Sequence, residues 1–195
     1  KPDCIIVKSR NVAGQDWVVY HKDLDSGSQP ATHILKLNTN GAEADIGDIW
    51  YDTEPTSSVF TVGDEAMVNY NSSSTYVAYC FKGVEGYSKF GKYVGNGQND
   101  GSFVYTGFKV KWLLIKRTSS EHWILADIAR NSVTGRENPA DSYLLASANN
   151  GESTGIVYDM LSNGFKFRSN SQNESGSTYV YMAFAESPFK YSRAR

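Results

Sequence analysis

The motif with the most specific chemistry lies at residues 151–155. Their sequence, Gly-Glu-Ser-Thr-Gly, fits G-x-S-x-G, which places a nucleophilic serine at a sharp strand-to-helix turn. That chemistry needs a histidine after the serine in chain order, but all three histidines precede Ser153. The segment after the motif has the pattern of another strand. We therefore expect an exposed loop here and no catalytic serine.

Two further patterns resemble ligand-binding loops. Gly95, Gly97 and Gly101 miss the dinucleotide fingerprint G-x-G-x-x-G by one position, and no helix follows them. Residues 23–27 (Asp-Leu-Asp-Ser-Gly) resemble a calcium loop, but the later glutamate of such loops is missing. We interpret both segments as turns.

Acidic residues are numerous, with 21 Asp and Glu, so a carboxylate pair for glycoside hydrolysis stays an alternative. Asp52 and Asp159 recur, each after a tyrosine (Tyr51 and Tyr158). A structural Tyr–Asp pairing at a strand end explains this recurrence more simply than two active sites. The two cysteines and three histidines lack metal-ligand spacing, so we expect no metal site, no cofactor and no catalytic residue.

A ligand-contact surface is the remaining candidate site. Tyr51, Tyr70, Asn71 and Tyr87 lie in expected loops and would suit a carbohydrate or a protein. Tyrosine supplies rigid amphipathic area, and asparagine supplies adaptable hydrogen bonds. Asn71 and Asn173 also begin glycosylation sequons, which we interpret as plain surface turns.

Composition excludes several classes of protein. Of 195 residues, 40% are hydrophobic and 21% charged, as in a globular domain. The net charge of −2 gives no electrostatic basis for binding nucleic acid or an anionic membrane. No apolar run approaches the roughly 20 residues of a membrane-spanning helix. The 13 Tyr and 17 Gly favour strands and turns over helices.

An internal repeat organises the chain, since six blocks recur in the same order with small gaps. The blocks are residues 4–8 with 112–116, 16–19 with 122–125, 40–43 with 150–153, 48–52 with 155–159, 60–62 with 165–167, and 74–81 with 177–184. Each block is short, rich in β-branched or aromatic residues, and bounded by turn residues, which is typical of strands.

We therefore predict an all-β protein of two tandem antiparallel β-sandwich (jelly-roll-like) repeats, residues 1–88 and 89–195. Residues 89–94 and 102–108 are expected to be opening strands of the second repeat, although their composition also suggests a linker. No such stretch precedes Lys1, so we expect the first repeat to be truncated within a longer polypeptide. Only residues 139–148 have a sequence that suits a short helix, with Pro139 at its first position.

The repeat makes predictions for single residues. Trp17 and Trp123 recur on the second strand, where core packing is a simpler explanation than sugar stacking on a surface. Lys8 and Lys116 recur on the first strand.

The two cysteines also have counterparts in the second repeat. Cys4 aligns with Trp112, and Cys80 aligns with Ala183. Two cysteines in the first repeat thus replace one large and one small residue in the second. Two neighbouring core positions would tolerate such an exchange. We expect Cys4 and Cys80 to be close together, buried and present as free thiols.

Several phrases of the sequence resemble a repeat family of bacteriophage tail-associated proteins, which often lies beside concanavalin-like lectin or glucanase domains. They are residues 2–8, 74–82, 95–108 and 179–191. Cys4 departs from the family pattern, which usually has an aromatic residue there. The family pattern ends near the C-terminus of the polypeptide, so Arg195 is expected to be the natural end.

The resemblance implies a virion structural protein, a tail fibre or receptor-binding component that acts in host recognition and is not an enzyme. It implies assembly in the bacterial cytoplasm with further copies of itself, a trimer among the options, and with other virion proteins. A host-surface glycan or protein would be the external partner. Two alternatives stay open: a stand-alone carbohydrate-binding lectin-like module, and a glycan depolymerase.

Overall fold

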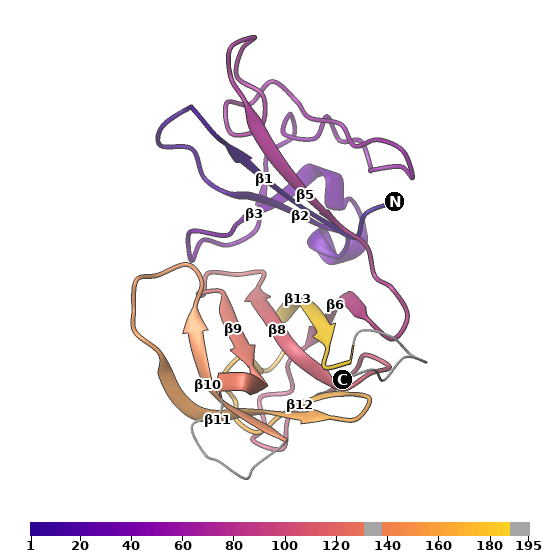
Figure 1. Cartoon of the computed structure of the whole chain (residues 1–195), viewed down its shortest axis with the longest axis vertical. Helices are drawn as coiled ribbons and strands as arrows, with labels where there is room; N and C mark the ends of the chain where they lie inside the picture. The colour runs from indigo at the N-terminus through magenta and orange to yellow at the C-terminus, as the bar shows by residue number, and fades with distance from the viewer. Residues whose placement is uncertain (131–137, 188–195) are drawn as a thin grey trace.

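The protein is all-β, as predicted, and consists of two antiparallel sheets (Figure 1). The structure is a computed structural model that describes residues 1–130 and 138–187, except for the side chains of residues 156 and 157. The only helical segments in these ranges are short 3-10 turns, η1 (Leu24–Gly27), η2 (Pro30–Thr32) and η3 (Ile128–Arg130). No described helix is long and apolar enough to cross a membrane.

The first sheet has five strands and lies in the upper part of Figure 1. In spatial order the strands are β4 (Ala44–Asp45), β3 (His33–Lys36), β2 (Val18–His21), β1 (Cys4–Ser9) and β5 (Tyr76–Phe81). A long irregular stretch between β4 and β5, which we call the cover segment (residues 46–74), packs Ile49, Trp50 and Val68 against one face of this sheet.

The second sheet has eight strands and curls until its two edge strands approach each other. In spatial order they are β6 (Ser88–Val94), β13 (Thr178–Ala185), β8 (Val110–Arg117), β9 (Ile124–Asp127), β10 (Pro139–Leu145), β11 (Ser153–Leu161), β12 (Gly164–Phe167) and β7 (Phe103–Tyr105). Lys89 of β6 donates from Nζ to the carbonyl of Tyr105 in β7 at 2.8 Å and lies over its ring. The Lys89 side chain thus links the edge strands β6 and β7, which do not pair with each other.

The aligned sequence blocks occupy matching positions in the two sheets. β1 lies between β2 and β5, and β8 lies between β9 and β13. Cys4 is opposite Phe81 and Ser9 opposite Tyr76, while the aligned residues Trp112 and Arg117 are opposite Phe184 and Tyr179. All six β1–β5 pairs match β8–β13 pairs in this way. The four β1–β2 pairs likewise match those of β8 and β9.

Alternation along the strands produces three apolar clusters. The first lies inside the curled second sheet and includes Leu113, Phe165 and Tyr181. The second lies between the sheets, where Ile6 and its counterpart Leu114 meet. The third lies between the first sheet and the cover segment. The sheets are also joined by two backbone hydrogen bonds, from Glu43 N–H to the Thr118 carbonyl and from Glu121 N–H to the Asn40 carbonyl.

Three predicted elements differ in the structure. Residues 139–145 form strand β10 rather than a helix, because they pair on both sides with β9 and β11. Residues 48–52 and 60–62 match strands β11 and β12 in sequence, but they form turns and irregular chain. In this stretch Gly63 lies so close to the Asp48 carbonyl that a Cβ would come within 1.3 Å of its oxygen, and Pro55 offers no N–H for a ladder.

Candidate functional site

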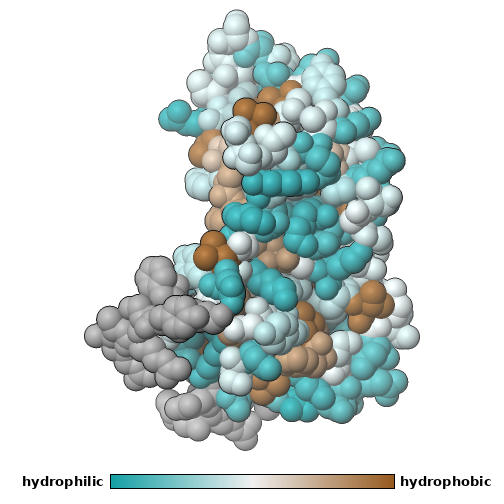
Figure 2. Space-filling model, turned by 90° about the vertical axis from the view of Figure 1, so that its right-hand side faces the viewer, coloured by the Kyte–Doolittle hydropathy of each residue, from teal (hydrophilic) through white to brown (hydrophobic). Residues whose placement is uncertain are grey.

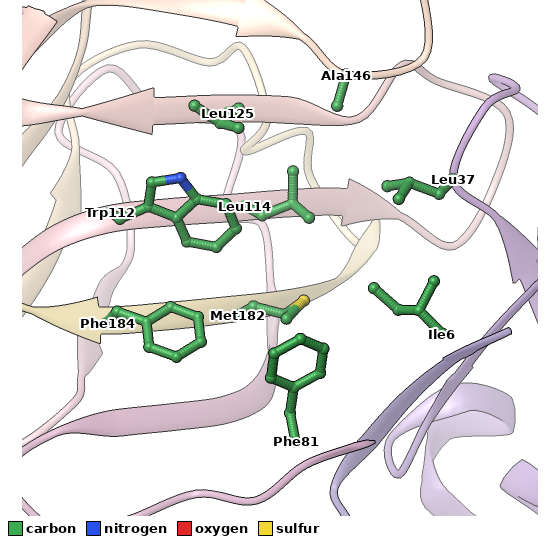
Figure 3. Close-up of a pocket in the computed structure, with 9 residues that line it drawn as sticks. All are labelled: Ile6, Leu37, Phe81, Trp112, Leu114, Leu125, Ala146, Met182 and Phe184. Atoms are coloured by element: carbon green, nitrogen blue, oxygen red, sulfur yellow. The ribbon is translucent and has the colours of Figure 1, made fainter. Parts of the chain in front are cut away.

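An apolar pocket of about 440 Å³ lies between the two sheets (Figure 3). Phe81 and Ile6 of the first sheet and Trp112 and Met182 of the second point towards the same space. The complete lining is Ile6, Leu37, Phe81, Trp112, Leu114, Leu125, Ala146, Met182 and Phe184. The lining offers apolar and aromatic surface and contains no acid, base or nucleophile. It suits an apolar group rather than a chemical reaction.

The pocket is built from equivalent positions of the two sheets. Its lining contains both Ile6 and Leu114, which are aligned, and both Phe81 and Phe184. The remaining lining residues on β8, β9 and β13 have no counterpart in the lining from the first sheet. Most of the lining therefore comes from the second sheet and its loops.

A polar cluster lies at one end of the curled sheet. Gln172 donates from Nε2 to Glu121 Oε1 at 3.2 Å, and Arg117 Nε lies 3.6 Å from Glu121 Oε2. Burial raises the pKa of Tyr93 and of Tyr158 well above the usual value, so both phenols stay protonated. Glu121 Oε2 and the Tyr158 hydroxyl are buried without a hydrogen bond from the described protein. Nothing in the sequence predicted this buried polar cluster.

The recurrent lysines have a structural role. Lys8 donates from Nζ to the Gln15 carbonyl at 2.5 Å, and Lys116 donates to the Arg117 and Ser119 carbonyls at 2.6 and 2.9 Å. Each lysine thus holds the loop that follows its own strand. Lys116 is buried, and this burial lowers its pKa to about 8.

The four predicted contact residues come from two segments of the chain. Tyr51 and Tyr70 are 53% and 58% exposed on the cover segment, and Asn71 follows Tyr70 directly. Tyr87 lies elsewhere, in the connection between the sheets, where its ring packs edge-on against Phe184 at 5.9 Å. Tyr87 is 40% exposed despite this contact, and the prediction that the four residues bind a ligand remains a prediction.

The enzyme-like motifs have structural explanations. Ser153 begins strand β11 opposite Tyr143, so the G-x-S-x-G segment lacks the strand-to-helix turn of a nucleophile elbow. Asp23 forms an ion pair with Lys22 at 2.7 Å, and Asp25 accepts a hydrogen bond from the Gln29 N–H at 3.1 Å. No group of three potential metal ligands occurs in the described ranges.

The recurrent Tyr–Asp pairs are not equivalent in structure. Tyr51 and Asp52 have φ angles of 49° and 46° in an exposed turn, so the expected pairing at a strand end is wrong for this copy. Tyr158 is buried within β11, and Asp159 beside it binds Arg168 at 2.5 Å. The recurrence therefore reflects sequence similarity without a shared contact.

The glycine-rich segment after β6 is shaped by one buried amide. Asn173 is fully buried and donates from Nδ2 to Asn96 Oδ1 at 2.7 Å and to the Gln98 carbonyl at 2.9 Å. A Cβ on Gly101 would come within 2.7 Å of this Nδ2 atom. The glycines permit close approach of two loops. Glu174 and Ser175 of the sequon are exposed, as expected for a surface turn, but the expectation is wrong for Asn173 itself.

Replacement of Asn173 by alanine should lower the free energy of unfolding by about 2 kcal/mol, because buried partners lose their hydrogen bonds. Urea denaturation would measure the change. Asn71→Ala is the matched control, since Asn71 is exposed and bonds only within its own turn, to Ser73 and Ser74. Equal effects of the two substitutions would contradict this account.

The cysteine prediction is half wrong. Cys4 and Cys80 lie on neighbouring strands and both are free, but Cys4 is opposite Phe81 and Cys80 is opposite Ile5. Consecutive residues of a strand point to opposite faces, so the two thiols lie on different sides of the sheet. Cys4 is buried between the sheets, whereas Cys80 is exposed because β5 is an edge strand.

One thiol per chain should react rapidly with Ellman's reagent in the native protein, and two after unfolding. Burial raises the pKa of Cys4 far above its usual value, which removes its thiolate, while Cys80 is accessible and its pKa is raised by partial burial. Cys80→Ser should abolish the native reaction, and Cys4→Ser should leave it. Two rapid thiols in the folded wild type would show that Cys4 is not buried.

Fold and sites together define an all-β protein whose two sheets share an apolar, pocketed interface. Residues 1–188 match the family described as a domain of unknown function, DUF7483, so the chain belongs to that family. No curated protein and no solved structure matches the chain.

Proposed function

We propose that this chain is a structural component of a bacteriophage virion, of the tail-fibre or receptor-binding type, that contributes to host attachment. In this proposal it consists of two tandem jelly-roll-like units, residues 1–88 and 89–195, that arose by duplication. The matching strand registers of β1–β5 and β8–β13 support the duplication. They carry the proposal together with the sequence resemblance, because repeated rigid β-units suit an extended particle component.

The contacts between the two sheets also support this role. Trp123 is buried there, and its indole N–H donates to the Lys36 carbonyl of the first sheet at 2.9 Å. Backbone hydrogen bonds add to the apolar contacts. These contacts hold the two sheets against each other, which suits a particle component that bears mechanical load.

The cover segment is the best candidate for the attachment surface. It presents the exposed rings of Tyr51 and Tyr70 on irregular chain supported by a packed sheet. Loops carried on a rigid scaffold commonly hold binding residues. On the face shown in Figure 2, hydrophilic residues predominate and apolar residues form small separate patches. The same exposed tyrosines favour the second candidate, a carbohydrate-binding module, since aromatic rings stack on apolar faces of ligands.

Two measurements test the proposal. Mass spectrometry and antibody labelling of purified phage particles should find the chain in the tail, and its absence from particles would refute a virion role. The purified chain should reduce phage adsorption to host cells. A Tyr51→Ser/Tyr70→Ser variant should lose this competition, whereas Tyr105→Ser, which alters an equally exposed tyrosine on β7, should retain it.

Glycan binding separates the alternatives. Binding to a glycan array by a chain absent from particles would favour the carbohydrate-binding module. Release of sugar from host polysaccharide would establish the depolymerase instead.

A further inference from the structure

Strand β5 has an unpaired edge whose backbone groups point away from the sheet. The Arg10 N–H donates to the Thr75 carbonyl at 2.8 Å, which fixes the alternation of hydrogen bonds along β5. By that alternation, the N–H and C=O groups of Tyr76, Ala78 and Cys80 point away from β1. Within the described chain no backbone hydrogen bond reaches these groups, so the edge is free to receive a strand.

This edge also lacks the features that normally prevent strand addition. Edge strands are commonly protected by charged side chains, proline or short length. β5 has six residues, Tyr-Val-Ala-Tyr-Cys-Phe, with no charge and no proline, and three of them are exposed. The other edges in the described sheets differ: β4 has two residues, β7 has three, and β6 carries Lys89 and Lys92. β5 is therefore the edge best suited to bind another strand.

The second sheet shows which strand fits this kind of edge. β13 is the counterpart of β5, and its corresponding edge is covered by β6 through seven antiparallel pairs. The Gly95 N–H donates to the Ser177 carbonyl and the Ala185 N–H to the Tyr87 carbonyl, which places alternate residues of β13, including Tyr179 and Tyr181, towards β6. Tyr179 and Tyr181 align with Tyr76 and Ala78, whose groups are free in β5.

β6 also inserts an aromatic ring between the sheets. Phe90 lies opposite Met182, is buried, and has its ring centre 6.1 Å from that of Phe81 and 6.0 Å from that of Phe184. Met182 aligns with Tyr79 of β5. An aromatic residue opposite Tyr79 would lie on the face of β5 that also carries Phe81, which lines the open pocket.

We propose that β5 accepts an extended strand from a neighbouring polypeptide, antiparallel to β5 and with the residue pattern of β6, and that the aromatic residue of this strand enters the pocket between the sheets. Backbone hydrogen bonds supply affinity in such strand addition, and the pocket supplies specificity. The inference does not depend on a virion role.

The test uses the whole chain and a fluorescent peptide with the sequence of residues 86–95, which covers β6. Fluorescence anisotropy should show saturable binding, and bound peptide should slow the alkylation of Cys80, which lies on the edge strand. Ala78→Pro removes an outward N–H and should weaken binding at least tenfold, whereas Ala78→Ser should bind like the wild type. The same peptide with Asp in place of Phe90 should bind at least tenfold more weakly.

A second variant covers the case in which Ala78→Pro fails to fold. Tyr79→Lys keeps the backbone and adds a charge to the edge, so it should also weaken binding. Failure of the wild-type chain to bind the peptide, or equal binding by the edge variants, would overturn the proposal. A wild-type dimer that Tyr79→Lys dissociates would overturn it too, because a second β5 would then be the occupant.

Discussion

Replacement of Trp123 by alanine should lower the free energy of unfolding by about 3–5 kcal/mol, the usual cost of truncating a large buried aromatic side chain. Trp123 is 2% exposed within the cluster between the sheets. Its indole N–H also donates to the Lys36 carbonyl, so the substitution removes a hydrogen bond between the two sheets. Chemical denaturation followed by circular dichroism would measure the loss.

The repeat provides a matched control for this prediction. Trp17 occupies the aligned position but is only partly buried at the margin of the same cluster. Trp17→Ala should therefore cost clearly less than Trp123→Ala. Trp123→Phe keeps most of the packing and loses the hydrogen bond, so its cost should lie between the two. Equal losses at both tryptophans would mean that the interface between the sheets does not depend on Trp123.

The strands and their recurrence were largely predictable from the sequence, and the aligned blocks form matching pairs in the two sheets. The blocks at residues 4–8 and 112–116 form β1 and β8, which pair with the strands formed by residues 76–81 and 178–185. The core role expected for the tryptophans is confirmed for Trp123. Local pattern and strand alternation are sufficient for such inferences.

The predictions failed where tertiary contacts outweigh local pattern. Residues 48–52 have the pattern of a strand, yet the side chains of Ile49 and Trp50 are buried between the cover segment and the sheet. The cysteine prediction failed because Cys80 and Phe81 are consecutive residues and face opposite sides of the sheet, and Cys4 lies opposite Phe81. Alternation contained the correct answer.

The candidate sites were least predictable. The pocket lining comes from β1, β5, β8, β9 and β13 and from two loops, and no sequence pattern brings these residues together. The cluster around Glu121 and Tyr158 likewise forms only because the second sheet curls. In contrast, the tyrosines of the cover segment could be proposed from composition alone, since exposure in a loop requires no long-range contact.

His21 is a buried histidine whose contacts define one neutral form. The Asp23 N–H donates to Nδ1 at 3.2 Å, and Nε2 lies 3.2 Å from the Tyr181 carbonyl, to which it can only donate. A proton on Nδ1 would oppose the Asp23 N–H. Asp23 Oδ2 is 3.9 Å from Nδ1, but Lys22 already binds this carboxylate at 2.7 Å. Burial thus dominates and lowers the pKa of His21 to about 4.

Acid should therefore destabilise the protein through His21. Because the pKa is about 4 in the folded chain and about 6.5 in the unfolded chain, the unfolded state takes up the proton first as the pH falls. The stability contributed by neutral His21 is complete above pH 6.5, declines below it, and has fallen by about 3 kcal/mol near pH 4. Urea denaturation across this range would measure the slope. His21→Gln keeps a donor and an acceptor but cannot titrate, so it should be less stable at pH 7 and show a flatter profile. An unchanged slope in His21→Gln would assign the acid sensitivity to the carboxylates instead.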